Sequence, residues 1–316
     1  MMLRRFRKQV RPATLLLSLL AAFPAIAQPN PPPFHIYGIA GIRVYISNMA
    51  AARTFYKTVT NAENRNCDLC ETGEPAAIRF ASGQFLLFSQ QPKGATLWNR
   101  IAEVSFEADN LKSLRQLFKA RKIKYQAEEQ DGEIVLLRAF DPEGHSLVFL
   151  NRDIPVRLKA FRADAATGSP LRETILHAGY IVKDPDAMNK FYRDLLGFRV
   201  YWHGGMEDTK TDWVDMQVPD GTQWIEYMLG VPPDSGPQAR GVMNHVALGV
   251  IDVRAADKAL ADLNVKLNVD EQPQIGRDGK WQLNLYDSDG TRVELMEFTP
   301  VAKPCCSEYT GPHPQP

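Results

Sequence analysis

Apolar and polar residues alternate in four similar stretches of the chain, and each stretch continues into a helical pattern. The stretches are 42–56, 104–118, 178–192 and 246–260. Apolar residues at every second position predict a half-buried strand, and the spacing of three and four that follows a polar turn predicts an amphipathic helix. Asp184 followed by Pro185 is a typical helix start, Asp252 is placed to cap a later copy, and Asn110 lies near the turn of another.

Each of these units ends with a polar or glycine-containing turn and a further apolar strand. The turns are 82–83, 141–144, 219–221 and 287–290, and the strands after them are 84–88, 145–150, 222–228 and 291–297. The intervening residues leave room for two more strands, so the repeat reads strand–helix–strand–strand–strand. We therefore expect an α+β fold of tandem paired βαβββ modules, in which each pair of modules joins its sheets into one cup-shaped domain.

The residues outside the repeats suggest a plan for the whole chain, in which each half is long enough to bury a core of its own. The expected segments are a signal peptide (1–27), a proline-rich spacer (28–36), a first cup (37–152), a polar linker (153–170), a second cup (171–300) and a tail without regular structure (301–316).

The N-terminus has the features of a secretory signal. Basic residues within 4–11 precede a short apolar run at 15–22, and Ala25-Ile26-Ala27 is typical of a cleavage site. The mature chain would begin near Gln28 and lie in the periplasm or outside the cell, without membrane contact. An uncleaved anchor is the alternative, although the apolar run is short for a bilayer.

Composition excludes some partners and leaves the cysteine chemistry open. The formal net charge is zero, with 23% charged residues, so no basic excess indicates a nucleic-acid partner. Export favours disulfides for the two cysteine pairs, Cys67 with Cys70 and Cys305 with Cys306. The pairs could bridge locally or to each other, and a structural zinc site is the alternative. The oligomeric state is not fixed by the sequence.

Four residues in the C-terminal half repeat with equal spacing. His177 opens the first strand of one unit and Glu226 lies in its last strand, while His245 and Glu294 occupy the same places in the next unit. A pseudo-twofold axis between the units would bring all four side chains together. A carboxylate between apolar neighbours on a central strand is costly unless it is paired or bound to metal.

This set predicts one divalent metal ion, which could be Zn, Ni, Co, Mn or Fe(II). With six-coordination, two positions would remain for water or for two adjacent oxygens of a small-molecule substrate. The ion would act as a Lewis acid, and Glu226 or Glu294 would be the catalytic base. The duller alternatives are a hydrogen-bonded core histidine and a surface glutamate. Trp213 and Trp224 could stack on a substrate ring or belong to the core.

The residues of the C-terminal half resemble the glyoxalase/bleomycin-resistance/dioxygenase family, also called the vicinal oxygen chelate superfamily. The motifs that carry the resemblance are His177, Asp184-Pro185, Phe191-Tyr192, Leu196-Gly197-Phe198, Asp220-Gly221 and Glu226, followed by His245, Asp287-x-Asp289-Gly290 and Val293-Glu294-Leu295. The resemblance covers roughly 40–300. It implies paired βαβββ modules, a metal at the centre of the cup, and four ligands at these positions in glyoxalase I-like members.

The N-terminal half departs from this pattern. Alignment puts Gly41 at the place of His177, Leu87 or Phe88 at that of Glu226, Glu103 at that of His245 and Val148 at that of Glu294. We therefore expect a degenerate first domain without metal, and interpret Glu103 as a surface or rim residue.

Four functions remain open. The favoured one is a metal-dependent lyase or isomerase. A two-domain extradiol dioxygenase with Fe(II) on His177, His245 and Glu294 is the second, although Glu226 would be surplus and the stretch 274–285 contains no histidine beside Tyr286. The third is a non-catalytic binder of a small ligand, and the fourth is a protein that binds a partner through its first cup.

Overall fold

The computed structural model describes residues 32–60, 64–65, 77–80, 82–93, 98–153, 174–263, 268–269 and 272–316. The expected signal peptide, the first part of the spacer (28–31) and nearly all of the linker (154–170) lie outside these residues, as do Cys67 and Cys70. The domain limits drawn from the sequence and the export of the chain therefore stay predictions.

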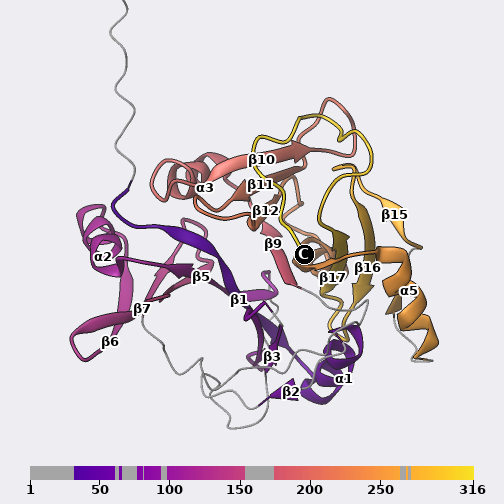
Figure 1. Ribbon diagram of the computed structural model, residues 1–316, viewed down its shortest axis with the longest axis horizontal. Coiled ribbons are helices and arrows are strands. Elements are labelled where there is room, and N and C mark those ends of the chain that lie inside the picture. The colour runs from indigo at the N-terminus through magenta and orange to yellow at the C-terminus, as the bar shows by residue number, and fades with distance from the viewer. Residues whose placement is uncertain are drawn as a thin grey trace, which may run out of the picture. The chain divides into compact units, whose positions relative to one another are not determined.

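Four modules follow one another along the chain (Figure 1). The first contains β1 (Ile36–Ile46), α1 (Met49–Thr60), β2 (Asn64–Arg65), β3 (Ala77–Arg79) and β4 (Phe85–Gln90). The second contains β5 (Ile101–Ala108), α2 (Leu111–Ala120), β6 (Tyr125–Gln130), β7 (Glu133–Phe140) and β8 (Ser146–Asn151).

The third module contains β9 (Thr174–Ile181), α3 (Pro185–Tyr192), β10 (Arg199–Gly204), β11 (Trp213–Gln217) and β12 (Trp224–Met228). The fourth contains β13 (His245–Val250), α5 (Val253–Asp262), β14 (Asn268–Val269), β16 (Trp281–Tyr286) and β17 (Arg292–Glu297). The repeat did not predict α4 (Pro237–Met243), between the third and fourth modules, or the short β15 (Gln274–Ile275), which pairs with β16.

The modules join in pairs, which confirms the predicted α+β fold of paired βαβββ modules. The first sheet has the order β2-β3-β4-β1-β5-β8-β7-β6, and the second has β10-β11-β12-β9-β13-β17-β16-β14. In each sheet the first strands of two modules pair antiparallel at the centre, and each is flanked by the last strand of its own module in parallel. This arrangement gives each sheet a local twofold symmetry around its central pair.

Polar side chains start the helices where the sequence indicated. Asp184 accepts from the backbone N–H of Ala187 at 3.0 Å, with Pro185 in the first turn of α3. Asp252 accepts from two N–H groups at the start of α5, and Asn110 caps α2. Each cap satisfies donors that the first helical turn leaves unpaired.

The largest apolar core extends through both halves, and each half also buries a smaller apolar cluster of its own. Phe106 of β5 packs edge-on against Phe198, which precedes β10, with ring centroids 5.7 Å apart. Buried hydroxyls also join the halves reciprocally. Tyr56 donates to Asp287, and Tyr192 donates to Asp141, each at 3.1 Å. The helix of the leading module in each sheet thus contacts the last turn of the other sheet.

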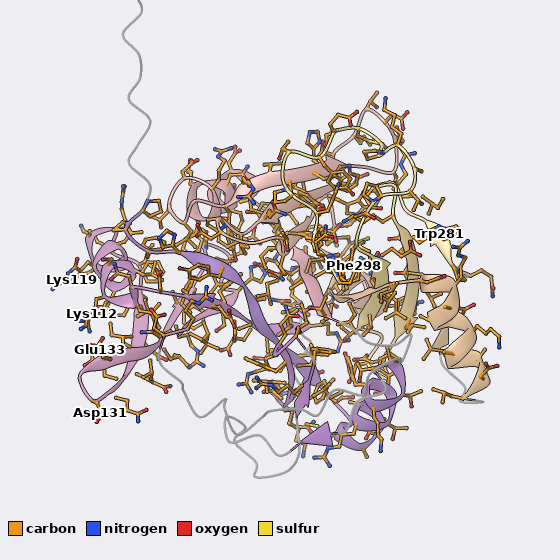
Figure 2. The ribbon with its side chains drawn as sticks, in the orientation of Figure 1. Lys112, Lys119, Asp131, Glu133, Trp281 and Phe298 are labelled. Carbon is orange, nitrogen blue, oxygen red and sulfur yellow. A yellow bond between two sulfur atoms is a disulfide. The ribbon has the colours of Figure 1, made fainter. Side chains whose placement is uncertain are left out.

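Side chains separate by polarity between the inside and the outside of this fold. Figure 2 places Phe298, which is 6% exposed, among the strands of the second sheet, whereas Lys112 and Glu133 lie on the outside, where they form an ion pair at 2.8 Å. Among the described residues, no helix is both long enough and apolar enough to cross a membrane.

The tail 301–316 has neither helix nor strand, but it packs along β10 (Figure 1). Thr310 donates its backbone N–H to the carbonyl of Tyr201 at 3.0 Å, and the Tyr309 hydroxyl donates to the Asp278 carbonyl at 2.8 Å. Cys305 and Cys306 form a disulfide with each other, which selects local bridging for this pair.

Candidate metal centre

Four potential ligands converge on one point of the second sheet. The Nε2 atoms of His177 and His245 are 2.8 Å apart, and Oε2 of Glu226 lies 3.2 Å from the first and 2.7 Å from the second. Oε2 of Glu294 is 3.7 Å from both nitrogens. The sequence-predicted residues therefore come together, with one ligand atom from each lying within 4.8 Å of the others.

Strand register explains why these residues meet. One row across the sheet runs Asp215, Glu226, Gly179, His245, Arg292, and a second runs Asn284, Glu294, Ala247, His177, Trp224. The local twofold axis exchanges the two rows, so each contributes one imidazole and one carboxylate with a small residue between them. Cross-strand neighbours on one face lie about 5 Å apart, which suits ligands of a shared ion.

The small residue in the first row makes space for the histidine beside it. A Cβ atom on Gly179 would lie 1.9 Å from the ring of His245, so only glycine allows this ring to lie across the strand. The sequence indicated this role, because small residues share a face with the histidines.

Replacement of Gly179 by alanine is expected to displace His245 and to lower the metal affinity by roughly 10- to 100-fold, as for loss of a residue that orients a ligand. Isothermal titration with a divalent ion measures this. Gly236→Ala is the matched control, since no atom lies within 4 Å of a Cβ there. Equal affinities in the two variants would contradict the positioning role of Gly179.

Burial and mutual contacts set the charges of this group. Burial lowers the pKa of His245 to about 3, with help from Arg292, so the imidazole is neutral in the metal-free protein. Burial alone would raise the pKa of Glu226, but the two imidazoles outweigh it and hold that pKa well below its usual range. Burial raises the pKa of Glu294.

The hydrogen bonds of the two imidazoles describe their metal-free state. Arg292 lies 2.9 Å from Nδ1 of His245, and because a guanidinium can only donate, the ring proton of His245 is on Nε2, facing Glu226. Nδ1 of His177 is buried and has no partner among the described residues. Two imidazoles and two carboxylates are a donor set that one divalent ion satisfies, and coordination through Nε2 of His245 requires the ring proton to move to Nδ1 as Arg292 withdraws from it.

The four residues lie at a cavity of about 450 Å³, which all of them except His245 line. The other lining residues are Trp202, Met206, Trp213, Asp215, Trp224, Val242, Gln274, Ile275, Gly276, Arg277, Asp278, Gln282, Asn284, Tyr286, Arg292 and Met296. Trp224 stacks on His177 with ring centroids 4.7 Å apart, so it belongs to both the core and the cavity wall. A cavity with apolar walls and a few convergent polar groups is typical of a small-molecule site.

Further buried charges lie beside the cavity. Lys280 is fully buried with its ammonium 4.6 Å from the centre of the Trp224 ring, and burial lowers its pKa. Asp215 and Asp278 interact with it, and burial raises the pKa of both acids. With Glu226 and Glu294 they make four acidic groups beside two basic ones, Lys280 and Arg292, and a bound divalent cation would favour the ionised form of these acids.

The equivalent place in the first sheet has a different composition. Register equates Gly41 with His177, Leu87 with Glu226, Glu103 with His245 and Val148 with Glu294. A Cβ atom on Gly41 would lie 2.1 Å from the Phe85 ring, so this ring covers the position that His177 holds in the second sheet. One donor out of four remains there, and the absence of metal from this domain stays a prediction.

The interpretation of Glu103 as a surface residue is wrong. Its side chain is 9% exposed and forms ion pairs with Arg43 at 3.7 Å and Arg138 at 3.0 Å. Arg43 lies directly opposite Glu103 on the neighbouring strand, so the buried carboxylate is neutralised by its cross-strand partner. Alignment of single residues could not reveal this pairing.

Sequence reasoning missed several residues of the site. Asp215 and Asn284 are the outermost members of the two rows, next to Glu226 and Glu294, and each is less than 10% exposed. Oδ1 of Asn284 has no partner among the described residues and belongs to a cavity-lining side chain. Asp215 precedes Glu226 by 11 residues and Asn284 precedes Glu294 by 10, and this near-equal spacing was the available signal.

Comparison with family models gives a match in the C-terminal half. Residues 174–295 match the model of the Glyoxalase/Bleomycin resistance protein/Dioxygenase superfamily. Comparison with curated proteins gives no match.

Solved structures of similar fold include several enzymes named as 2,3-dioxygenases. Homoprotocatechuate 2,3-dioxygenase from Brevibacterium fuscum, in complex with 3,4-dihydroxyphenylacetate, is 18% identical at a TM-score of 0.59, over 86% of this chain and 83% of that one. The enzyme of the same name from Arthrobacter globiformis is 18% identical at 0.60, over 84% and 81%. A 2,3-dioxygenase from Pseudomonas sp. KL28 is 14% identical at 0.60, over 89% and 95%. At these identities the likeness establishes the two-domain fold.

Proposed function

We propose that this chain, a member of the glyoxalase/bleomycin resistance/dioxygenase (vicinal oxygen chelate) superfamily, is a metal-dependent enzyme that acts on a small molecule with two neighbouring oxygens. One divalent ion would bind to His177, Glu226, His245 and Glu294. The observation that carries the proposal is the convergence of their four ligand atoms beside a cavity of about 450 Å³.

The bound ion would supply Lewis acidity toward the two substrate oxygens. The residues of the chain supply the base that transfers a proton and the cavity walls that surround the substrate. Glu226 is the better-placed base, because its side chain is 12% exposed and lines the cavity, whereas that of Glu294 is 4% exposed. It would take a proton from the carbon beside the bound oxygens and return it to a neighbouring carbon, which is an isomerase- or lyase-like reaction.

The walls of the cavity would orient the substrate and exclude water. Trp202, Trp213 and Trp224 offer flat apolar surfaces, and Asn284 offers an amide oxygen without a partner among the described residues. Removal of water strengthens the electrostatic interactions between the substrate and the buried charges around it. We also propose that the chain is exported, on the N-terminal pattern alone.

A ring-cleaving dioxygenase that binds Fe(II) through His177, His245 and Glu294 is the second candidate. The similar fold of three such enzymes over more than 80% of this chain favours it. The position of Glu226 disfavours this candidate. Oε2 of this residue lies 2.7 Å from Nε2 of His245, so it would occupy a coordination position that the substrate needs.

Glu226→Gln distinguishes the candidates. Four ligands predict that this substitution weakens metal binding and abolishes turnover, whereas three ligands predict unchanged metal content and retained ring cleavage. The measurements are metal content by mass spectrometry of the purified protein, followed by a hemithioacetal isomerisation assay and a catechol ring-cleavage assay. Ligand binding that survives Glu226→Gln, without turnover in either assay, would instead support a non-catalytic binder. Absence of metal from the wild-type protein would reject both enzymes.

A further inference from the structure

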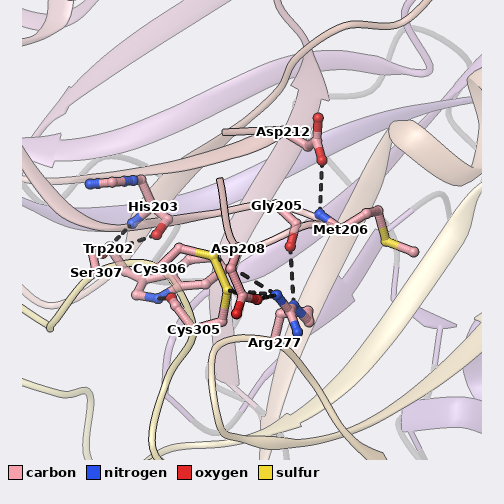
Figure 3. The surroundings of a disulfide bond; sticks show 10 residues. All are labelled: Trp202, His203, Gly205, Met206, Asp208, Asp212, Arg277, Cys305, Cys306 and Ser307. Carbon is pink, nitrogen blue, oxygen red and sulfur yellow. Dashed lines mark hydrogen bonds and ion pairs between the residues drawn. A yellow bond between two sulfur atoms is a disulfide. The ribbon is translucent and has the colours of Figure 1, made fainter. Parts of the chain in front are cut away.

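A second reactive group lies at the rim of the cavity, where the tail passes. Cys305 and Cys306 form their disulfide there (Figure 3), with Cys305 partly buried and Cys306 exposed. A disulfide between adjacent residues closes only its own turn and does not cross-link distant parts of the chain. Its effect must therefore come from what this turn contacts.

The turn holds Arg277, a residue of the cavity wall. The backbone N–H of Cys305 donates to the carbonyl of Arg277 at 2.8 Å, and Nη2 of Arg277 donates to Sγ of Cys305 at 2.8 Å. The guanidinium also donates to the carboxylate of Asp208 and, through Nε, to the carbonyl of Gly205 at 3.1 Å. Figure 3 shows the guanidinium between the disulfide and the loop after β10.

The same turn holds a second residue of the cavity wall. Nε1 of Trp202 donates to the carbonyl of Cys305 at 3.1 Å, and the Ser307 hydroxyl accepts from the N–H of His203 at 2.9 Å. Trp202 belongs to the third module and Arg277 to the fourth, and both line the cavity. The peptide groups of Cys305 thus connect two lining residues that come from different modules.

We propose that Cys305–Cys306 is a thiol–disulfide exchange site that controls access to the cavity, and that a small dithiol or a dithiol protein is its reaction partner. The inference rests on the proposed function, because control of access to the cavity matters only if a substrate binds there. The exposed sulfur of Cys306 receives the attack of the first thiolate, and the sulfur–sulfur bond breaks with its electron pair on Cys305. The second thiolate of the reductant then displaces Cys306, so two thiols form here as the dithiol becomes a disulfide.

Arg277 favours the first step. The leaving thiolate of Cys305 forms beside its guanidinium, and a neighbouring cation stabilises a thiolate. The Asp208 carboxylate, 3.6 Å from the Cys305 sulfur, opposes this effect, but its side chain is 83% exposed and is itself paired with Arg277.

Reduction of the Cys305–Cys306 disulfide removes the covalent constraint on this turn. Cys306 has a φ of 73°, which a non-glycine residue adopts only when its surroundings enforce it. Without the disulfide this residue returns to the ordinary region of backbone conformation, and Cys305 loses its fixed orientation toward Arg277 and Trp202. The mouth then opens between the third and fourth modules.

Hydrogen exchange of the full-length protein, with and without dithiothreitol, tests the proposal. In the reduced protein, amide exchange in segments 200–207, 274–280 and 301–310 should be about tenfold faster or more, because local opening governs it. Release of bound divalent metal to a chelator should accelerate by a similar factor. The Cys305→Ser/Cys306→Ser variant should behave as reduced protein without dithiothreitol, and the Cys67→Ser/Cys70→Ser variant should respond as the wild type does.

Equal exchange in both redox states would overturn the inference, as would a response to dithiothreitol that persists in the Cys305→Ser/Cys306→Ser variant. The exchange measurement does not require metal. A protein that binds no metal but still opens on reduction would contradict the proposed function alone.

Discussion

Replacement of His245 by alanine is expected to abolish metal binding at micromolar concentrations and to leave the fold intact. The residue supplies one of four ligand atoms at the point where the two symmetric rows meet. Its loss removes a ligand, so the fall in affinity should exceed the roughly 10- to 100-fold typical of an outer partner. Equilibrium dialysis against Zn, Ni, Co and Mn, with metal content by mass spectrometry, measures the change.

Two further variants turn this result into a graded series. Arg292→Gln removes a residue that contacts Nδ1 of His245 at 2.9 Å without being a ligand, and should lower affinity by roughly 10- to 100-fold. Glu103→Gln changes the residue that occupies the place of His245 in the first sheet, and it should leave the metal affinity unchanged. Loss of binding in Glu103→Gln, or retention in His245→Ala, would move the site away from the second sheet.

The position of the site could be predicted because periodicity and duplication constrain it jointly. Strand parity puts His177 and Gly179 on one face, and the repeat puts Glu226 at the matching place in the last strand. Neither requires long-range information, since a module brings its own first and last strands together in parallel. The second copy then supplies the other two ligands through the symmetry of the central pair.

The rest of the site depends on contacts that no repeat encodes. Arg277 reaches the cavity from a turn before β16, and the tail residue Cys305 fixes it there. The tail occurs once in the chain, so it has no second copy against which its pattern could be compared. The shared core could not be predicted for the same reason, because Phe106 and Phe198 meet through packing of two sheets whose strands pair only within themselves.

Acid is expected to destabilise the metal-free protein through His245. In the folded chain this imidazole has a pKa of about 3, compared with an ordinary value of 6.5. Its contribution to stability is fully present above pH 6.5 and is lost as the pH falls toward 3. Over this range His245 binds a proton in the unfolded chain but stays neutral in the folded chain. Linkage gives a slope of about 1.4 kcal/mol per pH unit for one proton within this window.

Urea unfolding of the chelator-treated protein between pH 6 and 4 measures how the free energy of unfolding depends on pH. Comparison with the His245→Gln variant gives the part that depends on His245. Glutamine keeps a polar group near Glu226 but does not titrate, so the wild-type protein should lose roughly 2–3 kcal/mol more than the variant over two pH units. The raised pKa of Asp287, about 6 through burial, acts in the opposite direction but is common to both proteins. Parallel slopes would mean that His245 is protonated in the folded chain, and a protonated imidazole cannot bind a metal. Metal-loaded wild-type protein should show a steeper loss, because protons then also compete with the ion for the same nitrogen.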